Sequence, residues 1–123
     1  MDKKKIIIVD DEKDFLMIAK LNLESTNKYE VVTSLDANNL LPEIYRFKPD
    51  LILLDLLMPS IGGFELCEMF NKDPAVKGIP VIICSALNND KEIQKAHKLG
   101  VTDFIAKPVA LDELIEKIKK VLS

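Results

Sequence analysis

The sequence has few of the residues that build metal cages or disulfide frameworks. It contains no tryptophan, one histidine and two cysteines in 123 residues. Two cysteines are too few for a disulfide framework, and one histidine cannot complete a zinc site with them. Cys84 lies in the apolar run 81–84, which is typical of a buried strand, and Cys67 lies in an expected helix. We interpret both as small core side chains.

Long apolar runs and a strong excess of one charge are also absent. The longest uninterrupted apolar run is Phe15–Ala19, far short of the roughly 20 residues that span a membrane. The lysines at 3–5 lead into only four apolar residues with no small-residue cleavage site after them, so we expect no signal peptide and a soluble, cytoplasmic protein. The formal charge of −3 argues against direct nucleic-acid binding, which requires a basic surface.

What the chain does contain is enough apolar material for one ordinary domain. Apolar residues make up 48% of the chain and charged residues 30%. This composition excludes intrinsic disorder, and the length favours a single domain over residues 1–123.

Short apolar runs alternate five times with longer segments of helical period. The run 51–54 is apolar without alternation, which is typical of a central parallel strand buried on both faces, whereas 29–32 contains a polar position that suits a sheet edge. Such alternation predicts a doubly wound α/β fold with helices on both faces of a mostly parallel sheet. The expected strands are 6–9, 29–32, 51–54, 81–84 and 103–105. The expected helices are 12–26, 36–47, one that follows Gly62-Gly63 and ends near Asn71, 90–99 and 111–122.

Ligands of such folds bind at the carboxyl ends of the strands, and polar residues follow four of the expected strands there. They are Asp10 and Asp11, then Asp55, Ser85 and Lys107. Taken singly, each has an ordinary explanation, such as a helix cap or a solvated charge. Together, crowded carboxylates suit Mg²⁺, and a carboxylate can attack a phosphoryl group whose outer oxygens the metal, an ammonium and a hydroxyl then hold. No residue suits a demanding general acid or base, so the donor must arrive already activated.

The blocks around these residues resemble the receiver domain of two-component response regulators over essentially the whole chain. The matching residues are Val9-Asp10-Asp11-Glu12, Asp55-Leu56-Leu57-Met58-Pro59 with Gly63, Ser85-Ala86, and Gly100 to Pro108. The resemblance implies a five-stranded parallel sheet of strand order 2-1-3-4-5, as in the CheY-like and flavodoxin-like three-layer sandwiches.

The resemblance also implies a role for each site residue. Asp55 would accept a phosphoryl group from a phosphohistidine on a sensor kinase or a histidine phosphotransfer protein. Mg²⁺ would be held by Asp10, Asp11, Asp55 and the backbone carbonyl of Leu57. Lys107 would pair with the phosphoryl group, the bond to Pro108 would be cis, and Pro59 and Gly63 would shape the loop after Asp55. Ser85 and Phe104 would form the switch.

The sequence departs from the family pattern at several positions. Phe104 replaces a frequent tyrosine, which removes any signal that needs a phenolic hydroxyl, and Gly62 stands where many relatives carry Asp. Leu57 and Leu87 are apolar where the family's attacking water passes, so we expect slow self-dephosphorylation. Apart from that and self-phosphorylation from the donor, we expect no enzymatic activity.

The responding surface of receivers is the fourth helix, fifth strand and fifth helix. Lys91, Lys95 and Lys98 recur there at helical spacing and form either a plain solvated face or a docking stripe for an acidic partner. We assign no role to His97. The downstream protein or attached output domain, the kinase and homodimerisation through this face stay open, and a stand-alone regulator and a receiver cut from a longer protein would look alike.

Three other functions rank below this switch. A Mg²⁺-dependent phosphatase with an aspartyl-phosphate intermediate usually has a second Asp where Leu57 stands. A degenerate receiver that acts only as a binding scaffold would have lost the acidic pair, the acceptor Asp or the Lys. All of these residues are present here. A flavodoxin-like electron carrier needs a phosphate-cradling loop where Asp10-Asp11-Glu12 would repel a phosphate.

Overall fold

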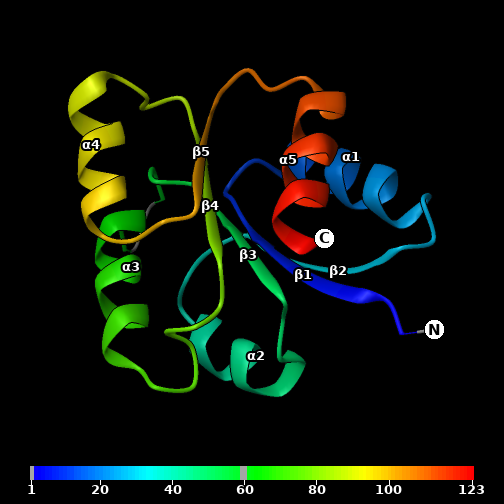
Figure 1. Cartoon of the computed structure of the whole chain (residues 1–123), viewed down its shortest axis with the longest axis horizontal. Helices are drawn as coiled ribbons and strands as arrows, with labels where there is room; N and C mark the ends of the chain where they lie inside the picture. The colour runs from blue at the N-terminus through cyan, green and yellow to red at the C-terminus, as the bar shows by residue number, and fades with distance from the viewer. Residues whose placement is uncertain (1, 59–60) are drawn as a thin grey trace.

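The β-strands form where the apolar runs lie, because each run is buried on the sheet between two helical layers. The computed structural model describes residues 2–58 and 61–123, and Pro59 lies outside them. Its elements alternate along the whole chain (Figure 1). They are β1 Lys4–Val9, α1 Lys13–Glu24, β2 Tyr29–Ser34, α2 Leu40–Phe47, β3 Leu51–Leu54, α3 Gly63–Lys72, β4 Val81–Ser85, α4 Asp90–Lys98, β5 Asp103–Ala106 and α5 Leu111–Leu122.

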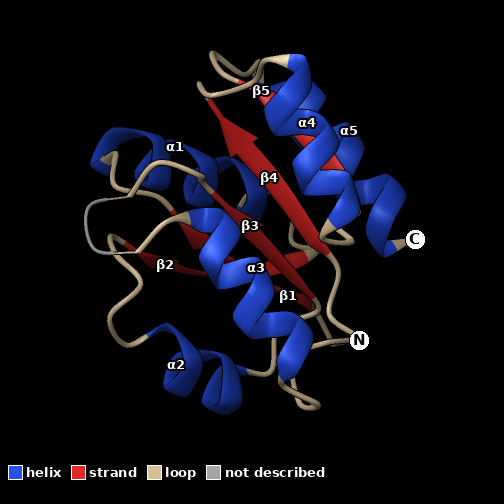
Figure 2. Ribbon diagram, turned by 90° about the vertical axis from the view of Figure 1, so that its left-hand side faces the viewer, coloured by secondary structure: helices blue, strands red, loops and turns tan. Residues whose placement is uncertain are grey.

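The five strands form one parallel sheet in the order β2-β1-β3-β4-β5. The doubly wound architecture and the strand order are therefore confirmed, with β2 at an edge. β3 pairs with both β1 and β4, and all four of its residues are buried, as its unbroken apolar run predicts. Figure 2 shows β1, β3 and β4 side by side between the helices.

Each face of the sheet has its own apolar core. Alternate strand residues point to opposite faces, so Ile7 and Ile52 pack with α2, α3 and α4, whereas Ile6 and Leu51 pack with α1 and α5. Figure 1 shows these two helical layers on either side of the sheet. Both cysteines are buried free thiols, Cys67 in the first core and Cys84 in the second.

The second helix starts four residues later than its periodicity predicts, at Leu40. The carboxylate of Asp36 accepts a hydrogen bond from the backbone N–H of Asn38 (2.9 Å), and Ser34 Oγ donates to the Asp36 carbonyl (2.7 Å). Asp and Asn form such local turns readily, and these compete with the first helical turn. The expected helix 36–47 is thus correct in its apolar stripe and wrong in its start.

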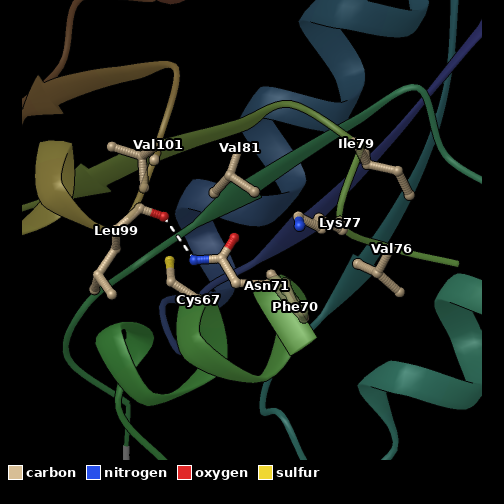
Figure 3. A pocket seen from close by; sticks show the side chains of 10 residues that line it. Cys67, Phe70, Asn71, Val76, Lys77, Ile79, Val81, Leu99 and Val101 are labelled. Carbon is tan, nitrogen blue, oxygen red and sulfur yellow. Dashed lines mark hydrogen bonds between the residues drawn. The ribbon is translucent and has the colours of Figure 1, made fainter. Parts of the chain in front are cut away.

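Figure 3 shows a small pocket whose lining includes Val81, the first residue of β4, so the pocket lies at the opposite end of the sheet from the carboxyl ends of the strands. It lies where α3 meets the segments leading into β4 and β5, and Asn71 Nδ2 donates to the Leu99 carbonyl beside it (2.8 Å). Its volume of about 30 Å³ has room for about one water molecule, so it offers no site for a larger ligand. Among the described residues, no helix is both long and apolar enough to cross a membrane.

Candidate functional site

Asp10 and Asp55 lie side by side because β1 and β3 are paired neighbours and each aspartate directly follows its strand. The Asp55 N–H donates to the Val9 carbonyl (3.0 Å), and the Asp10 N–H donates to the Ser34 carbonyl (3.0 Å). These bonds extend the backbone ladder one residue past each strand. Both aspartates are almost fully buried, at 1% and 5% exposure.

Four carboxylates gather at this edge of the sheet. Asp10, Asp11, Glu12 and Asp55 each offer one oxygen, and these oxygens all lie within 4.8 Å of one another. Asp11 and Glu12 are exposed, so the cluster opens to solvent on one side. Backbone donors fix the buried members: the Glu12 N–H donates to Asp10 Oδ1 (2.9 Å), and the Leu57 N–H donates to Asp55 Oδ1 (3.2 Å).

Lys107 supplies the positive charge of the cluster. Its Nζ lies 2.6 Å from Asp10 Oδ2, 2.9 Å from Glu12 Oε1 and 3.4 Å from Asp55 Oδ2. Burial by itself disfavours the ammonium, but the hydrogen bonds with Asp10 and Glu12 and the nearby carboxylate charges outweigh it, so the pKa of Lys107 is raised. The side chain therefore stays charged at neutral pH.

For Asp10, unlike Lys107, burial outweighs the contacts that favour the charged form. Burial raises the pKa of its carboxyl, and the hydrogen bonds from Lys107 and the Glu12 N–H only partly offset that rise. Crowded carboxylates with one lysine among them are short of positive charge, which is the electrostatic condition that a bound cation relieves.

Lys107 reaches the cluster because β5 pairs with β4. The Lys107 N–H donates to the Ser85 carbonyl (3.0 Å), and the peptide bond to Pro108 is cis, the form that the resemblance implies. On its other side the ammonium lies 4.9 Å from the centre of the Phe15 ring, a cation–π contact with α1.

The two switch candidates lie beside the carboxylate cluster and not in it. Ser85 is fully buried, and its Oγ accepts a hydrogen bond from the Leu87 N–H (3.1 Å). Among the described residues, its hydroxyl donates to no partner. Phe104 is half-buried against the core that contains α3 and α4. Asp10, Asp11, Asp55 and Lys107 are thus brought together, whereas the Ser85 hydroxyl and the Phe104 ring contact none of them by a hydrogen bond in the described part of the chain.

Gly63 lies directly under the backbone of Asp55. A Cβ at Gly63 would be 2.6 Å from the Asp55 carbonyl oxygen and 2.8 Å from Leu56 Cα. The Gly63 N–H also donates to the Leu56 carbonyl (3.0 Å). Gly63 therefore shapes the loop after Asp55, as expected, whereas Gly62 has an ordinary extended backbone with φ −73° that needs no glycine.

Sequence reasoning missed two ionic contacts. Glu12 belongs to the matching block but received no role, and it pairs with Lys107 although its side chain is 60% exposed. Lys117 lies outside the apolar stripe of α5, yet it is half-buried and pairs with Asp103 of β5 (3.2 Å). Apolar periodicity carries no signal for either contact, because both depend on which strand end lies next to which helix.

The donor set fits a hard divalent cation. Four carboxylates from two neighbouring strand ends, partly open to water, are the oxygen ligands that Mg²⁺ prefers, since it keeps several of its waters. At the same edge, the buried carboxylate of Asp55 lies 3.4 Å from the Lys107 ammonium. This combination can bind and stabilise a phosphoryl group next to an oxygen nucleophile.

Comparison with known proteins agrees with this geometry. The family model of the response regulator receiver domain matches residues 6–119. The chain therefore belongs to the receiver domains of two-component response regulators, which are phosphoacceptor domains that interact with a phosphodonor kinase and with output partners.

Several solved structures are similar over nearly the whole chain. A response regulator from Desulfuromonas acetoxidans is 31% identical, covering 97% of this chain and 96% of that one, with a TM-score of 0.85. The non-phosphorylated HemR receiver domain from Leptospira biflexa is 30% identical, covering 98% and 95%, with a TM-score of 0.89. The BeF3-activated N-terminal receiver domain of RstA from Klebsiella pneumoniae is 25% identical, covering 97% and 98%, with a TM-score of 0.87.

Proposed function

We propose that this domain is a signalling switch in which Asp55 accepts a phosphoryl group from a phosphohistidine on a sensor kinase or a phosphotransfer protein. The observation that carries the proposal is the position of Lys107, whose ammonium contacts Asp55, Asp10 and Glu12 at once. A lysine placed between the acceptor and the other carboxylates offers the phosphoryl oxygens a positive charge at the point where they arrive.

The residues around Asp55 have different roles in the proposed phosphoryl transfer. Its Oδ1 accepts a hydrogen bond from the Leu57 N–H, which orients the carboxylate, and Oδ2 faces Lys107. An Asp55 oxygen attacks phosphorus, and the electron pair of the breaking bond stays on the donor nitrogen. Lys107 then pairs with one phosphoryl oxygen. The free hydroxyl hydrogen of Ser85 offers a donor for a second.

Mg²⁺ is the cofactor that this donor set suits. Asp10, Asp11 and Asp55, with the backbone carbonyl of Leu57, would hold it, and the exposed Glu12 belongs to the same cluster. When bound, Mg²⁺ neutralises the carboxylates and the incoming phosphoryl charge.

The signal would leave through α4, β5 and α5. Moving a two-state domain from 1:99 to 99:1 takes about 5.5 kcal/mol of differential stabilisation, and charge-assisted bonds to Ser85 and Lys107 contribute to it. The Ser85 hydroxyl would move toward the phosphoryl group, and the half-buried Phe104 ring beside α4 would swing inward behind it. Lys91, Lys95 and Lys98 are exposed on α4, and this face suits an acidic partner.

We further propose that the domain does not turn over phosphate esters and that it loses its own phosphoryl group slowly. Leu57 and Leu87, two residues after Asp55 and Ser85, have no group that could activate a water molecule. A phosphoaspartate lifetime of seconds in Mg²⁺, or turnover of a simple phosphomonoester, would contradict this.

Intact-mass spectrometry after incubation with acetyl phosphate tests the switch. We expect one added phosphoryl group in Mg²⁺ and none in EDTA or in Asp55→Asn. The matched control is Asp112→Asn, an exposed aspartate on α5, which should be phosphorylated like the wild type. A wild-type chain that gains no mass in Mg²⁺ would instead favour a binding scaffold.

A further inference from the structure

Beside the carboxylate cluster lies a second, mostly apolar pocket that the proposed transfer does not use. Its volume is about 360 Å³. It shares Lys107 and Glu12 with the cluster, and its remaining lining is apolar: Phe15, Ala86, Pro108 and Val109. A pocket with a charged wall on one side and apolar walls on the other suits a small amphipathic group.

Phe15 links this pocket to the reacting centre. The Lys107 ammonium lies 4.9 Å from the Phe15 ring centre and 3.4 Å from Asp55 Oδ2, so one side chain contacts both the ring and the acceptor. Phe15 comes from the first turn of α1, and its half-buried ring also packs on the core beneath that helix. The ring is therefore held in place at the edge of the site.

The leaving group of a phosphohistidine has the chemistry of this pocket. In the transfer, the P–O bond to Asp55 forms as the P–N bond breaks, and the electron pair remains on the ring nitrogen. If the second ring nitrogen already carries a proton, the imidazole departs neutral and needs no acid from the protein. A flat neutral ring gains more from an aromatic and apolar surface than ammonia or acetate does.

We propose that Phe15, with Ala86 and Val109, forms a subsite for the imidazole ring of the phosphodonor. This inference rests on the proposed phosphoacceptor role of Asp55 and adds a specificity-determining residue to it. Phe15 distinguishes donors by their leaving group, and so favours phosphohistidine over donors without a ring.

Two small donors with the same P–N bond test this directly. Phosphoimidazole releases imidazole, and phosphoramidate releases ammonia. The rate of phosphorylation in Mg²⁺ is measured with each donor, by intact mass, for wild type, Phe15→Leu and Phe15→Tyr. The matched control is Phe47→Leu, because Phe47 also has a lysine over its ring (Lys5, 5.5 Å) but is remote from the cluster, on α2.

The expected result is a selective loss. Phe15→Leu lowers the phosphoimidazole-to-phosphoramidate rate ratio roughly three- to tenfold, the range of an aromatic pair contact. Phe15→Tyr and Phe47→Leu keep the wild-type ratio. Circular dichroism confirms that each variant is folded, and Phe15→Met replaces Phe15→Leu if the leucine variant is not.

Three results would overturn the subsite. Equal slowing with both donors would mean that Phe15 acts only through Lys107. Unchanged rates with both donors would mean that the leaving group does not contact the ring. A lower ratio in Phe15→Tyr would mean that the aromatic ring is not what matters. Failure of the phosphoacceptor role looks different: the wild type then gains no phosphoryl group from either donor.

Discussion

The contact between Gly63 and the Asp55 backbone makes a sharp prediction about one methyl group. In Gly63→Ala, the new Cβ meets the Asp55 carbonyl oxygen at 2.6 Å, whereas ordinary contacts of this kind begin near 3.4 Å. The first turn of α3 and the peptide after Asp55 must therefore separate by about 0.8 Å, the difference between these two values. Both sides are backbone in a packed core, so no flexible side chain can absorb the change.

The expected cost is that of overpacking, about 1–3 kcal/mol of unfolding free energy. For a domain of this size that lowers the melting temperature by about 3–5 °C per kcal/mol. Because the displaced peptide carries Asp55, the proposed phosphoacceptor, phosphorylation from acetyl phosphate should also slow, by about tenfold or more.

Gly62→Ala is the matched control, one residue earlier. A Cβ at Gly62 has only ordinary contacts, the nearest being Glu65 Oε1 at 3.4 Å. The lower chain entropy of the unfolded state and the poorer helix N-cap roughly cancel, so stability should change by less than about 0.5 kcal/mol. Urea unfolding followed by circular dichroism measures both variants. Equal stability of Gly63→Ala and Gly62→Ala would refute the packing argument.

Four further outcomes follow from the site and the core. Without Mg²⁺, Lys107→Met should lower the free energy of unfolding by about 3 kcal/mol at pH 7, since it leaves buried carboxylates unpaired. Urea titrations at lower pH should show a smaller loss, because Asp10, whose pKa is raised, takes up a proton there. Mg²⁺ should raise the melting temperature, by the equivalent of about 2.7 kcal/mol at a hundred times its Kd, and Asp11→Asn should weaken that rise. Ser85→Ala should cost about 1 kcal/mol and leave phosphorylation intact while removing the accompanying change in tryptic cleavage of α4; a variant that still shows that change would exclude the Ser85 switch. Burial raises the pKa of Cys67 to about 11 and that of Cys84 to about 12, so neither thiol should react with iodoacetamide in the folded protein at pH 8, and both should react in urea; this resistance should fade only as the pH rises well above 9.

The order of strands and helices along the chain could be predicted because each apolar run is compatible with only one kind of buried element. The run Leu51–Leu54 can only be a central strand, and the stripe of α5 can only face a core. The strand order came from the family resemblance and not from periodicity. The late start of α2 escaped prediction because Asp36 forms a local turn whose strength depends on Ser34 at the end of a strand.

The candidate site also contains residues that the sequence identified and contacts that it could not predict. Asp10, Asp55 and Lys107 were identified because each directly follows a strand, and neighbouring strands bring such residues together. The contact of Phe15 with Lys107 could not be inferred, since it depends on how α1 packs against the end of β5. Pairing of Lys117 with Asp103 was missed for a related reason: the long aliphatic stem of a lysine lets it leave the outer face of a helix.

The bond between Lys107 and Asp10 joins residues 97 positions apart, and this has a consequence for how the domain matures. Contacts so distant in the chain form only after the intervening strands have paired, because closing such a loop early costs too much entropy. During synthesis, a chain that has emerged as far as Asp55, the residue after β3, already contains every carboxylate of the cluster but not its lysine. On the proposed role of Asp55 and Lys107, we therefore expect the ability to take up a phosphoryl group to arise late in folding, so that partly folded chains are not phosphorylated.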